Sequence, residues 1–567
     1  MRKHALILAF AALPATLWLA AAPARAQWTN DPWNGMVSVC NAPEDQSNLR
    51  ICALAGNRTF IAWMDERGPA DYSIYYQILD AFGNATREPN GEPVIDANWF
   101  IGWGTCKSSI VPDGQGGCIA VFEDDRNGTW DIYGQRFDSL GNRLWGAQGL
   151  PLVPWPGTWD TMPKDLNSDS LGNFFLSWAT GINGNCDIYI QKFTAEGLRL
   201  WGECGVPVCT EMAIQDLQQS VPDGQGGILD VWMDERSGWE EYKLYGQHLD
   251  ADGNPLWQPN GLRLRNTQGA AMWVQDIAEG LPDGHGGGYW FFKTPGGLNN
   301  LQGIHLTGQG RTTWWLNLYY NWAYTVFAVC SQPESGGIWI SDWECVTLPN
   351  VYTYNVHRID PATGTLPFGR FGLPYGGQAM APVGGGVMTF RLAWSYTAPH
   401  PGTRLTAMRV DSSGRLIWHS EVVLSHIVAD IPYSPYNPLG AVTMQNGDAV
   451  VAFHDWRDTT NLQNISAQRV QSNGSLGNPP TPVTSQEGEL IGGISGTMLS
   501  FVLPAAGEVR IEIFDLLGRL VVREELGYQA AGAHRTRLEN SGLASGIYLL
   551  RLNTPVGCHI IKMVVFH

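Results

Sequence analysis

The sequence predicts an all-β chain, in which a β-propeller of seven or eight blades is followed by a small β-sandwich. A unit of about 55 residues recurs along most of the chain, and each copy reads as four short strands. Near residue 485 this pattern stops and a different alternation begins. We therefore expect a signal peptide at 1–26, the propeller at 27–485 and the sandwich at 486–567.

The N-terminal segment has the features of a secretory signal peptide. Arg2 and Lys3 precede an acid-free, mostly apolar run from residue 5 to 22, and Ala-x-Ala at 24–26 suits cleavage after Ala26. A membrane anchor is the alternative, but Pro14 and the small residues at the end favour cleavage. No later segment has ~18 uninterrupted apolar residues. We expect a chain exported by the Sec route, with no transmembrane segment once the signal is removed.

The charge of the chain argues against nucleic acid as a partner. The sequence has 35 Lys and Arg against 53 Asp and Glu, and removal of the signal takes away Arg2, Lys3 and Arg25, which leaves a formal charge of −21. Such a surface repels phosphate backbones, and no basic cluster compensates locally.

Ten cysteines in an exported chain are compatible with disulfides. Spacing alone does not give their pairing. Three pairs are close in sequence and are the first to test: Cys40/Cys52, Cys106/Cys118 and Cys330/Cys345. No Cys-x-x-Cys occurs, so neither a zinc ribbon nor a thioredoxin-like site is supported.

The repeat is most visible where "VPDGQGG" occurs at 111–117 and again at 221–227, two units apart. The stretch "SLGNFFLSWATGINGNCDIYIQKF" at 170–193 fits the same frame between them. Eight copies can be marked by one glycine each: Gly56, Gly116, Gly172, Gly226, Gly286, Gly336, Gly385 and Gly447.

Each copy predicts four strands and a turn at each end. A short strand leads into the Asp-Gly turn, a nearly continuous apolar strand such as "CIAVF" follows, then a strand like "DIYGQRF", a turn like "DSLGN", and a last strand built on "LW". The second strand is apolar on both faces, so neighbouring copies must cover it. Radial stacking achieves this with only short exposed edges, whereas a linear solenoid would have a shorter period.

Closure of the ring can be read in two ways. The segment "WNGMVSVCN" at 33–41 looks like the end of a unit without a unit before it, as expected when the two chain ends share the last blade. The last copy, however, has its own candidate strand in "PPTPVTS" at 479–485. Seven and eight blades therefore both remain possible.

The Asp-Gly and Asp-Arg motifs favour structural roles. Asp113 with its following glycines suits a tight turn, because a phosphate loop would open a helix and continue into Gly-Lys-Ser/Thr. "DADGN" at 250–254 suggests calcium but lacks the later acid of a complete loop, so we expect no cofactor, with calcium as the alternative. The motifs "DER", "DDR" and "DWR" predict repeated ion pairs in Asp65/Arg67, Asp124/Arg126, Asp234/Arg236 and Asp455/Arg457.

The 25 tryptophans separate into two groups. Those that recur in frame predict core packing: Trp63, Trp145, Trp178, Trp201, Trp232 and Trp257. Trp314, Trp315 and the residues proposed below fall in variable segments that join one unit to the next. These segments should emerge on the same face as the loops after "DER", where function tends to lie. The candidate ligand-binding residues are Trp99, Trp103, Trp155, Trp159, Trp273, Trp322, Asp216 and Asp276. For the two acids, hydrogen bonding to neighbouring loops is the alternative.

The alternating segments "VRIEIFD" and "IYLLRL" predict that the C-terminal part of the chain forms a small β-sandwich. It resembles the type A C-terminal sorting domain of type IX secretion substrates through "FVLP" (501–504), "FDLLGR" (514–519), "SGIYLLRL" (545–552) and "KMVVF" (562–566). The resemblance implies an immunoglobulin-like fold and recognition of residues 486–567 by the type IX secretion machinery. The related domain of flagellar hook-capping proteins shares much of this pattern, which leaves a purely structural role open.

Three functions fit these observations. The favoured one is a non-catalytic extracellular or cell-surface propeller that binds a glycan or a surface protein, since carboxylates and aromatic rings suit sugars. A second is a polysaccharide hydrolase or lyase, which would need a pair of carboxylates or an Arg and Tyr set near the channel. A third is a structural envelope component without a ligand.

Overall fold

The computed structural model contains 40 β-strands and no helix in the part of the chain that it describes. The described residues are 28, 32, 36–67, 72–96, 101–103, 109–153, 161–169, 171–182, 185–238, 242–265, 276–277, 280–294, 300–319, 328–332, 337–347, 351–369, 372–395, 402–418, 420–428, 439–455, 463–477, 493–495, 498–503, 506–515, 519–530, 532–537, 546–554 and 557–565. The chain divides into two compact units between residues 478 and 479.

The described residues of the first unit form eight antiparallel sheets, numbered here in chain order. Sheet 1 contains β2 (Gln46–Leu54), β3 (Arg58–Asp65), β4 (Ser73–Leu79) and β5 (Glu92–Pro93). Sheet 2 contains β6 (Ile101–Gly102), β7 (Ile110–Pro112), β8 (Cys118–Asp124), β9 (Asp131–Phe137) and β10 (Leu150–Pro151). Sheet 3 contains β11 (Thr161–Ser168), β12 (Asn173–Ile182), β13 (Asn185–Thr194) and β14 (Val206–Cys209). Sheet 4 contains β15 (Gln215–Pro222), β16 (Ile228–Asp234), β17 (Lys243–Leu249) and β18 (Leu262–Arg263).

The remaining four sheets continue the same order. Sheet 5 contains β19 (Asp276–Ile277), β20 (Leu281–Pro282), β21 (Gly288–Thr294), β22 (Asn300–Leu306) and β23 (Thr312–Tyr319). Sheet 6 contains β24 (Ala328–Gln332), β25 (Gly337–Thr347) and β26 (Val351–Ile359). Sheet 7 contains β27 (Ala379–Val383), β28 (Gly386–Ser395), β29 (Gly402–Asp411) and β30 (Val422–Val428). Sheet 8 contains β31 (Leu439–Thr443), β32 (Ala449–Asp455), β33 (Asn464–Val470) and β1 (Val37–Cys40).

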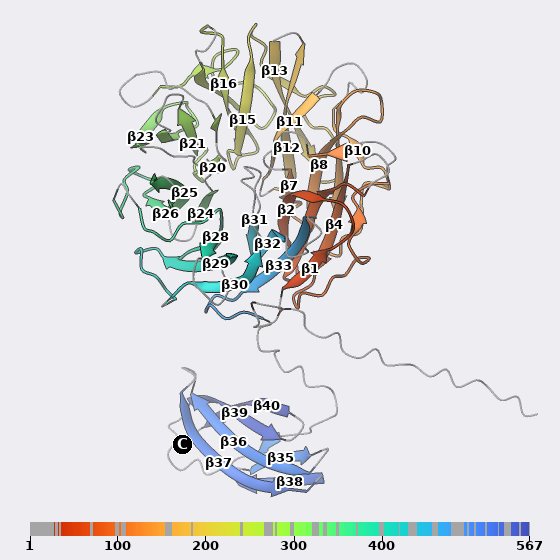
Figure 1. Cartoon of the computed structure of the whole chain (residues 1–567), viewed down its shortest axis with the longest axis vertical. Coiled ribbons are helices and arrows are strands. Elements are labelled where there is room, and N and C mark those ends of the chain that lie inside the picture. Colours follow the sequence, from red (N-terminus) through yellow and green to blue (C-terminus); the bar gives the residue numbers. More distant parts are fainter. Residues whose placement is uncertain are drawn as a thin grey trace, which may run out of the picture. The chain divides into compact units, whose positions relative to one another are not determined.

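The eight sheets surround a common centre in chain order (Figure 1). An apolar cluster lies between each sheet and the next, and a further cluster joins sheet 8 to sheet 1. The second strands β8 and β16 are buried almost throughout, because a neighbouring sheet covers each of their faces. The expectation that each copy hides its apolar strand against the next copy is confirmed.

Sheet 8 takes its outer strand from the other end of the chain. β1 pairs antiparallel with β33, with Val37 opposite Ala467, and Figure 1 shows these two strands side by side. Val37 and Val39 are buried in the cluster that sheet 8 shares with sheet 1. The segment at 33–41 therefore ends a unit in the way that the sequence suggested, while the rival candidate at 479–485 lies outside the described residues.

The heptapeptide "VPDGQGG" forms the turn between the first two strands of a sheet. Asp113 accepts hydrogen bonds at Oδ1 from the amides of Gln115 and Gly117, both at 2.8 Å. Gly114 and Gly116 have φ of +72° and +94°, a region that side chains disfavour. The turn reading is confirmed.

The last strand of a copy is not built on "LW", which corrects the sequence prediction. In sheet 2 the last strand, β10, begins five residues after Trp145, and the indole instead reaches the next sheet. Five tryptophans donate through Nε1 to a carbonyl in the following sheet's turn: Trp145 to Ala195 (3.2 Å), Trp201 to Ala251 (3.0 Å), Trp257 to Gly308 (2.9 Å), Trp314 to Pro361 (2.8 Å) and Trp418 to Ser472 (3.2 Å). Trp314 thus belongs to the recurring group, contrary to the expectation from its variable surroundings.

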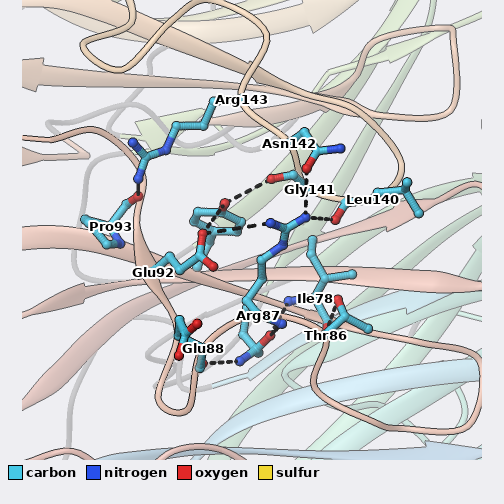
Figure 2. A network of polar contacts seen from close by, with 12 residues as sticks. Ile78, Thr86, Arg87, Glu88, Glu92, Pro93, Leu140, Gly141, Asn142 and Arg143 are labelled. Carbon is cyan, nitrogen blue, oxygen red and sulfur yellow. Dashed lines mark hydrogen bonds and ion pairs between the residues drawn. The ribbon is translucent and has the colours of Figure 1, made fainter. Parts of the chain in front are cut away.

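Arg87 occupies the corresponding place between sheets 1 and 2 (Figure 2). Its guanidinium donates to the carbonyl of Leu140 and to Oδ1 of Asn142, the latter at 3.3 Å. Tyr76 adds a hydrogen bond from its hydroxyl to the carbonyl of Gly141 at 2.9 Å. Polar side chains therefore replace the indole at this junction.

A basic residue of the third strand also bridges successive sheets, a feature that the sequence analysis missed. Arg136 donates to Oδ2 of Asp113 in its own sheet at 2.9 Å and to the carbonyl of Ala195 in the next at 3.3 Å. Lys192, His248 and Arg469 lie in frame with it and bond to Gly226, Gly308 and Ala81 of the following sheet. The Arg469 contact joins sheet 8 to sheet 1 at 2.8 Å.

The second unit consists of two antiparallel sheets. One contains β34 (Gly493–Ser495), β35 (Met498–Leu503) and β38 (Gly532–Arg537), and the other contains β37 (Leu520–Gln529), β36 (Gly507–Asp515), β39 (Gly546–Thr554) and β40 (Gly557–Val565), in that order. Ile511 and Ile513 of β36 are buried with Leu550 and Leu552 of β39. One face of the second sheet is thus apolar, as the alternation predicted.

Candidate functional site

The aspartates of the "DER" and "DDR" motifs are fully buried at the ends of the second strands. The Asp65 carboxylate lies 3.0 Å from Nε of Arg67, and Asp234 accepts from Nε of Arg236 at 2.8 Å. Asp124 accepts from Nε of Arg126 at 2.8 Å. The predicted pairs are therefore formed within single sheets; Arg457, the partner expected for Asp455, lies outside the described residues.

Aromatic residues complete these clusters. The guanidinium carbons of Arg67, Arg126 and Arg236 lie 4.0, 3.6 and 4.3 Å from the ring centres of Tyr75, Tyr133 and Tyr245. Indole Nε1 atoms donate to Asp65 at 2.7 Å from Trp63 and to Asp234 at 2.9 Å from Trp232. Burial raises the pKa of Asp65, although the Trp63 and Arg67 contacts oppose that effect. Since the Asp–Arg pair and the Tyr ring against the guanidinium recur in three sheets, they act as a structural tie.

Another group of polar side chains lies where the first strands of sheets 3 and 4 adjoin. Nζ of Lys164 on β11 forms an ion pair with Oδ1 of Asp216 on β15 at 2.9 Å, and their side chains are 9% and 37% exposed. Asp165 is buried and accepts at Oδ2 from Nδ2 of Asn167 and from the Ser220 amide, both at 2.7 Å.

Asp230 of β16 is also buried in this group and accepts from the hydroxyl of Ser220 at 3.0 Å. Burial, assisted by the negative charge of Asp165, raises the pKa of Asp230 to about 8. Asp165 and Asp230 are thus closed to a substrate, while the accessible carboxylate of Asp216 is neutralised by Lys164. These acids are suited to holding two sheets together rather than to proton transfer on a bound sugar.

The structure describes three of the eight candidate ligand-binding residues in part or in full. Trp103 is only 2% exposed and packs in the cluster between sheets 1 and 2, so its assignment to a binding surface is corrected to core packing. Asp216 is the second residue of β15, the first strand of sheet 4, and its ion pair is with Lys164 on the neighbouring strand β11 rather than with a loop. Asp276 begins β19, opposite Lys293. The others lie outside the described residues: Trp99, Trp155, Trp159, Trp273 and Trp322.

Asp250, the first acid of the suspected calcium loop, is occupied by its own turn. Its Oδ1 accepts the amides of Asp252 and Asn254 at 3.0 and 2.8 Å. Within the described residues, no group of three or more His, Cys, Asp or Glu side chains is arranged to hold a metal ion.

Two of the cysteine pairings suggested by sequence proximity are inconsistent with the strand positions. Cys40 lies in the cluster between sheets 8 and 1, whereas Cys52 faces the cluster between sheets 1 and 2. Cys330 is opposite Trp339 on β25, and Cys345 lies six residues further along that strand. That separation is about 20 Å at 3.3 Å per residue, far beyond the reach of a disulfide. Cys106 lies outside the described residues.

Among the described residues of the second unit, Glu512 is a buried carboxylate whose pKa is shifted. Glu512 accepts from Nε of Arg523 at 3.0 Å and from Nε of Arg551 at 2.8 Å, the residues directly opposite it on the two neighbouring strands. Asn553 donates a further bond at 3.1 Å. Although burial opposes ionisation, these donors lower the pKa of Glu512 to about 2.

Several solved structures match this chain, and they share little sequence with it. PorZ, a surface component of the type IX secretion system of Porphyromonas gingivalis, is 11% identical with a TM-score of 0.34, covering 93% of this chain and 60% of PorZ. An α-L-arabinanase of Penicillium chrysogenum is 14% identical (TM-score 0.34; 57% of this chain, 97% of the arabinanase). The polysaccharide lyase Uly1 is 10% identical (TM-score 0.37; 76% and 90%). At these scores, the likenesses carry no argument about activity.

No curated protein matches the chain in sequence. None of the described residues forms a helix that has the length and apolarity needed to cross a membrane. Residues 497–566, however, match the family described as the secretion system C-terminal sorting domain. The resemblance read from "FVLP", "FDLLGR" and "SGIYLLRL" is confirmed, and the chain carries a type IX secretion sorting domain at its C-terminal end.

Proposed function

We propose that the protein is a non-catalytic binding protein of the cell surface or extracellular space. In this proposal the first unit is an eight-bladed β-propeller that recognises a glycan or a surface protein. The second is an immunoglobulin-like domain, recognised by the secretion machinery. The non-catalytic part of the proposal is supported by the acidic side chains of the described residues, which are engaged in structural contacts. Asp65, Asp124 and Asp234 are buried in ion pairs. Asp216 is paired with Lys164, and Asp230 is buried.

The proposed binding face is the one that carries the connections from the last strand of a sheet to the first strand of the next. Trp99 falls between β5 and β6, Trp155 and Trp159 between β10 and β11, Trp273 between β18 and β19, and Trp322 between β23 and β24. Since the strands of each sheet alternate in direction, these connections emerge on the same face as the loops after "DER". Aromatic residues on loops of a rigid ring are suited to stacking on sugar rings.

The test compares two variants of the full secreted chain on a glycan and peptide array. Trp99, Trp155 and Trp159 are changed to alanine in one. In the matched control, Leu171→Ala and Leu198→Ala alter exposed residues in turns of the opposite face. We expect the first variant to lose binding and the control to keep it. Equal binding by both would remove the aromatic face from the proposal.

A polysaccharide hydrolase or lyase is the second candidate. Asp276, which lies at the start of β19 opposite Lys293, is the carboxylate that this candidate would use. Release of reducing sugar or of unsaturated product from an array-positive polysaccharide would favour this candidate. A structural component without a ligand remains the third, and complete absence of binding on the array would favour it.

A further inference from the structure

Two buried thiols from neighbouring sheets meet between sheets 1 and 2. Cys52 lies on β2, the first strand of sheet 1, and Cys118 begins β8, the strand of sheet 2 that pairs with β6, β7 and β9. Both residues belong to the apolar cluster of this junction, and the thiols lie close enough that Cys52, after burial, is among the causes that raise the pKa of Cys118. Cys52 is 5% exposed and Cys118 is fully buried.

A backbone hydrogen bond between sheets 1 and 2 places the two cysteines next to each other along their strands. The amide of Ala55, three residues after Cys52, donates to the carbonyl of Gly116, two residues before Cys118, at 2.9 Å. Phe60 is directly opposite Cys52 and Phe137 is directly opposite Cys118. The ring centres of these two phenylalanines are 4.9 Å apart. The closeness of the two cysteines therefore follows from the packing of whole strands.

The equivalent positions of other junctions show that this is where successive sheets approach. Between sheets 4 and 5 they are Val221 and Gly288, and a Cβ on Gly288 would lie 2.9 Å from Cγ2 of Val221. Between sheets 2 and 3 they are Val111 and Phe174, which share one apolar cluster. A pair of cysteines replaces these apolar contacts between sheets 1 and 2.

The other buried thiols of the described first unit have different surroundings. Cys209 is buried against Arg236, whose Nη2 lies 2.9 Å from its sulfur. Cys40 is influenced by the charges of Arg67 and Asp65 at the corresponding place in sheet 1. Each of these two thiols therefore lies against an ion pair instead of a second thiol.

We propose that Cys52 and Cys118 form a disulfide that joins sheets 1 and 2 in the exported protein. The sorting domain implies passage through an oxidising compartment, where a thiol-oxidising protein disulfide is the oxidant. One cysteine thiolate attacks that disulfide and releases one thiol, and the second thiolate then attacks the mixed disulfide and releases the other. The two protons and two electrons of the cysteines end on the oxidant's two thiols. Because both cysteines are buried after folding, the bond forms while the sheets assemble.

The direct test is mass spectrometry of the full secreted chain, purified without reductant and alkylated with N-ethylmaleimide in denaturant. We expect a linked peptide containing Cys52 and Cys118, and alkylation of both residues only after reduction. Alkylation of both without prior reduction would overturn the proposal. A linkage of either residue to Cys106 would also overturn it.

Thermal unfolding provides a second readout. We expect refolding from denaturant in the presence of dithiothreitol to lower the Tm of the wild-type chain by ~5 °C and to leave the Tm of the Cys52→Val/Cys118→Ala variant unchanged. Cys204→Ser, at an exposed cysteine, serves as the matched control and should respond to reductant like the wild type. A Tm of the wild type that does not respond to reductant would contradict the proposal, and this result does not depend on whether the double variant folds.

Discussion

Replacing Glu512 by glutamine removes the negative charge that accepts hydrogen bonds from Arg523 and Arg551 in the sorting domain. A pKa of about 2 in the folded domain, against an ordinary 4.5, corresponds to about 3.4 kcal/mol of stability at neutral pH. The side chains of Arg523 and Arg551 are 53% and 39% exposed, so solvent screens them and reduces this figure to about 1–2 kcal/mol. We expect Glu512→Gln to destabilise the second unit by that amount at pH 7.

The pH dependence separates this charge effect from a simple packing defect. The folded pKa lies below the unfolded value, so the stabilisation is complete above about pH 4.5 and is lost as the pH falls towards 2. Hydrogen exchange in a urea series, measured on peptides from β36 and β39, should show the difference from wild type shrink by more than half at pH 3. Glu525→Gln, at an exposed carboxylate 3.9 Å from Arg510, is the matched control and should cost less than about 0.5 kcal/mol. An equal loss at pH 7 and pH 3 would refute the electrostatic explanation.

Three further predictions concern the first unit. Gly261→Ala should destabilise it by about 2–4 kcal/mol in urea unfolding, because a Cβ at this position would lie 2.2 Å from the Trp232 ring and φ is +85°. Gly146→Ala is the control: its φ is +76° but the space around it is open, so it should cost about 1 kcal/mol. Equal costs for the two variants would contradict the steric argument. Trp201→Phe should cost about 1 kcal/mol through the lost bond to Ala251, and a neutral result would mean that this contact does not stabilise the junction. Asp230 keeps its proton in the folded state up to about pH 8, whereas an aspartate in the unfolded chain ionises near pH 3.8. The free energy of unfolding of the wild type should therefore fall between pH 4 and 8 relative to that of Asp230→Asn. Parallel pH profiles of the two proteins would refute the raised pKa.

The repeating part of the fold could be predicted from the sequence because most copies contain a strand that must be covered on both faces. A strand such as "ILDVWMD" is apolar on both faces and needs a cover on each side, and the next copy supplies it. The turns were equally readable, since an aspartate followed by glycines at fixed spacing has few alternatives. The pairing of β1 with β33 was likewise suggested by a unit end without a unit before it.

Contacts between copies were harder to predict, because they join residues about 50 positions apart. Trp314 looked variable, since its local neighbours differ from those of Trp257, but its indole bonds to the next sheet in the same way. The basic residues of the third strands recur in frame at Arg136, Lys192 and His248, and this periodicity could have revealed them. Sequence proximity offers Cys40 and Cys106 as the first partners to test for Cys52 and Cys118, whereas the fold places Cys52 and Cys118 in one apolar cluster between neighbouring sheets.

The junction between sheets 1 and 2 differs from the others in a way that connects these observations. In sheet 1 the frame position of Arg136 is filled by Ile78, and the position of Trp145 is filled functionally by Arg87. An isoleucine donates no hydrogen bond to the next sheet, so this junction lacks a polar bridge that sheets 2, 3, 4 and 8 have. A ring opens first at its weakest junction, because each sheet needs both neighbours to cover its apolar strands. Arg87, the Tyr76 hydroxyl and the cysteine pair are therefore best understood as the contacts that compensate at the junction between sheets 1 and 2.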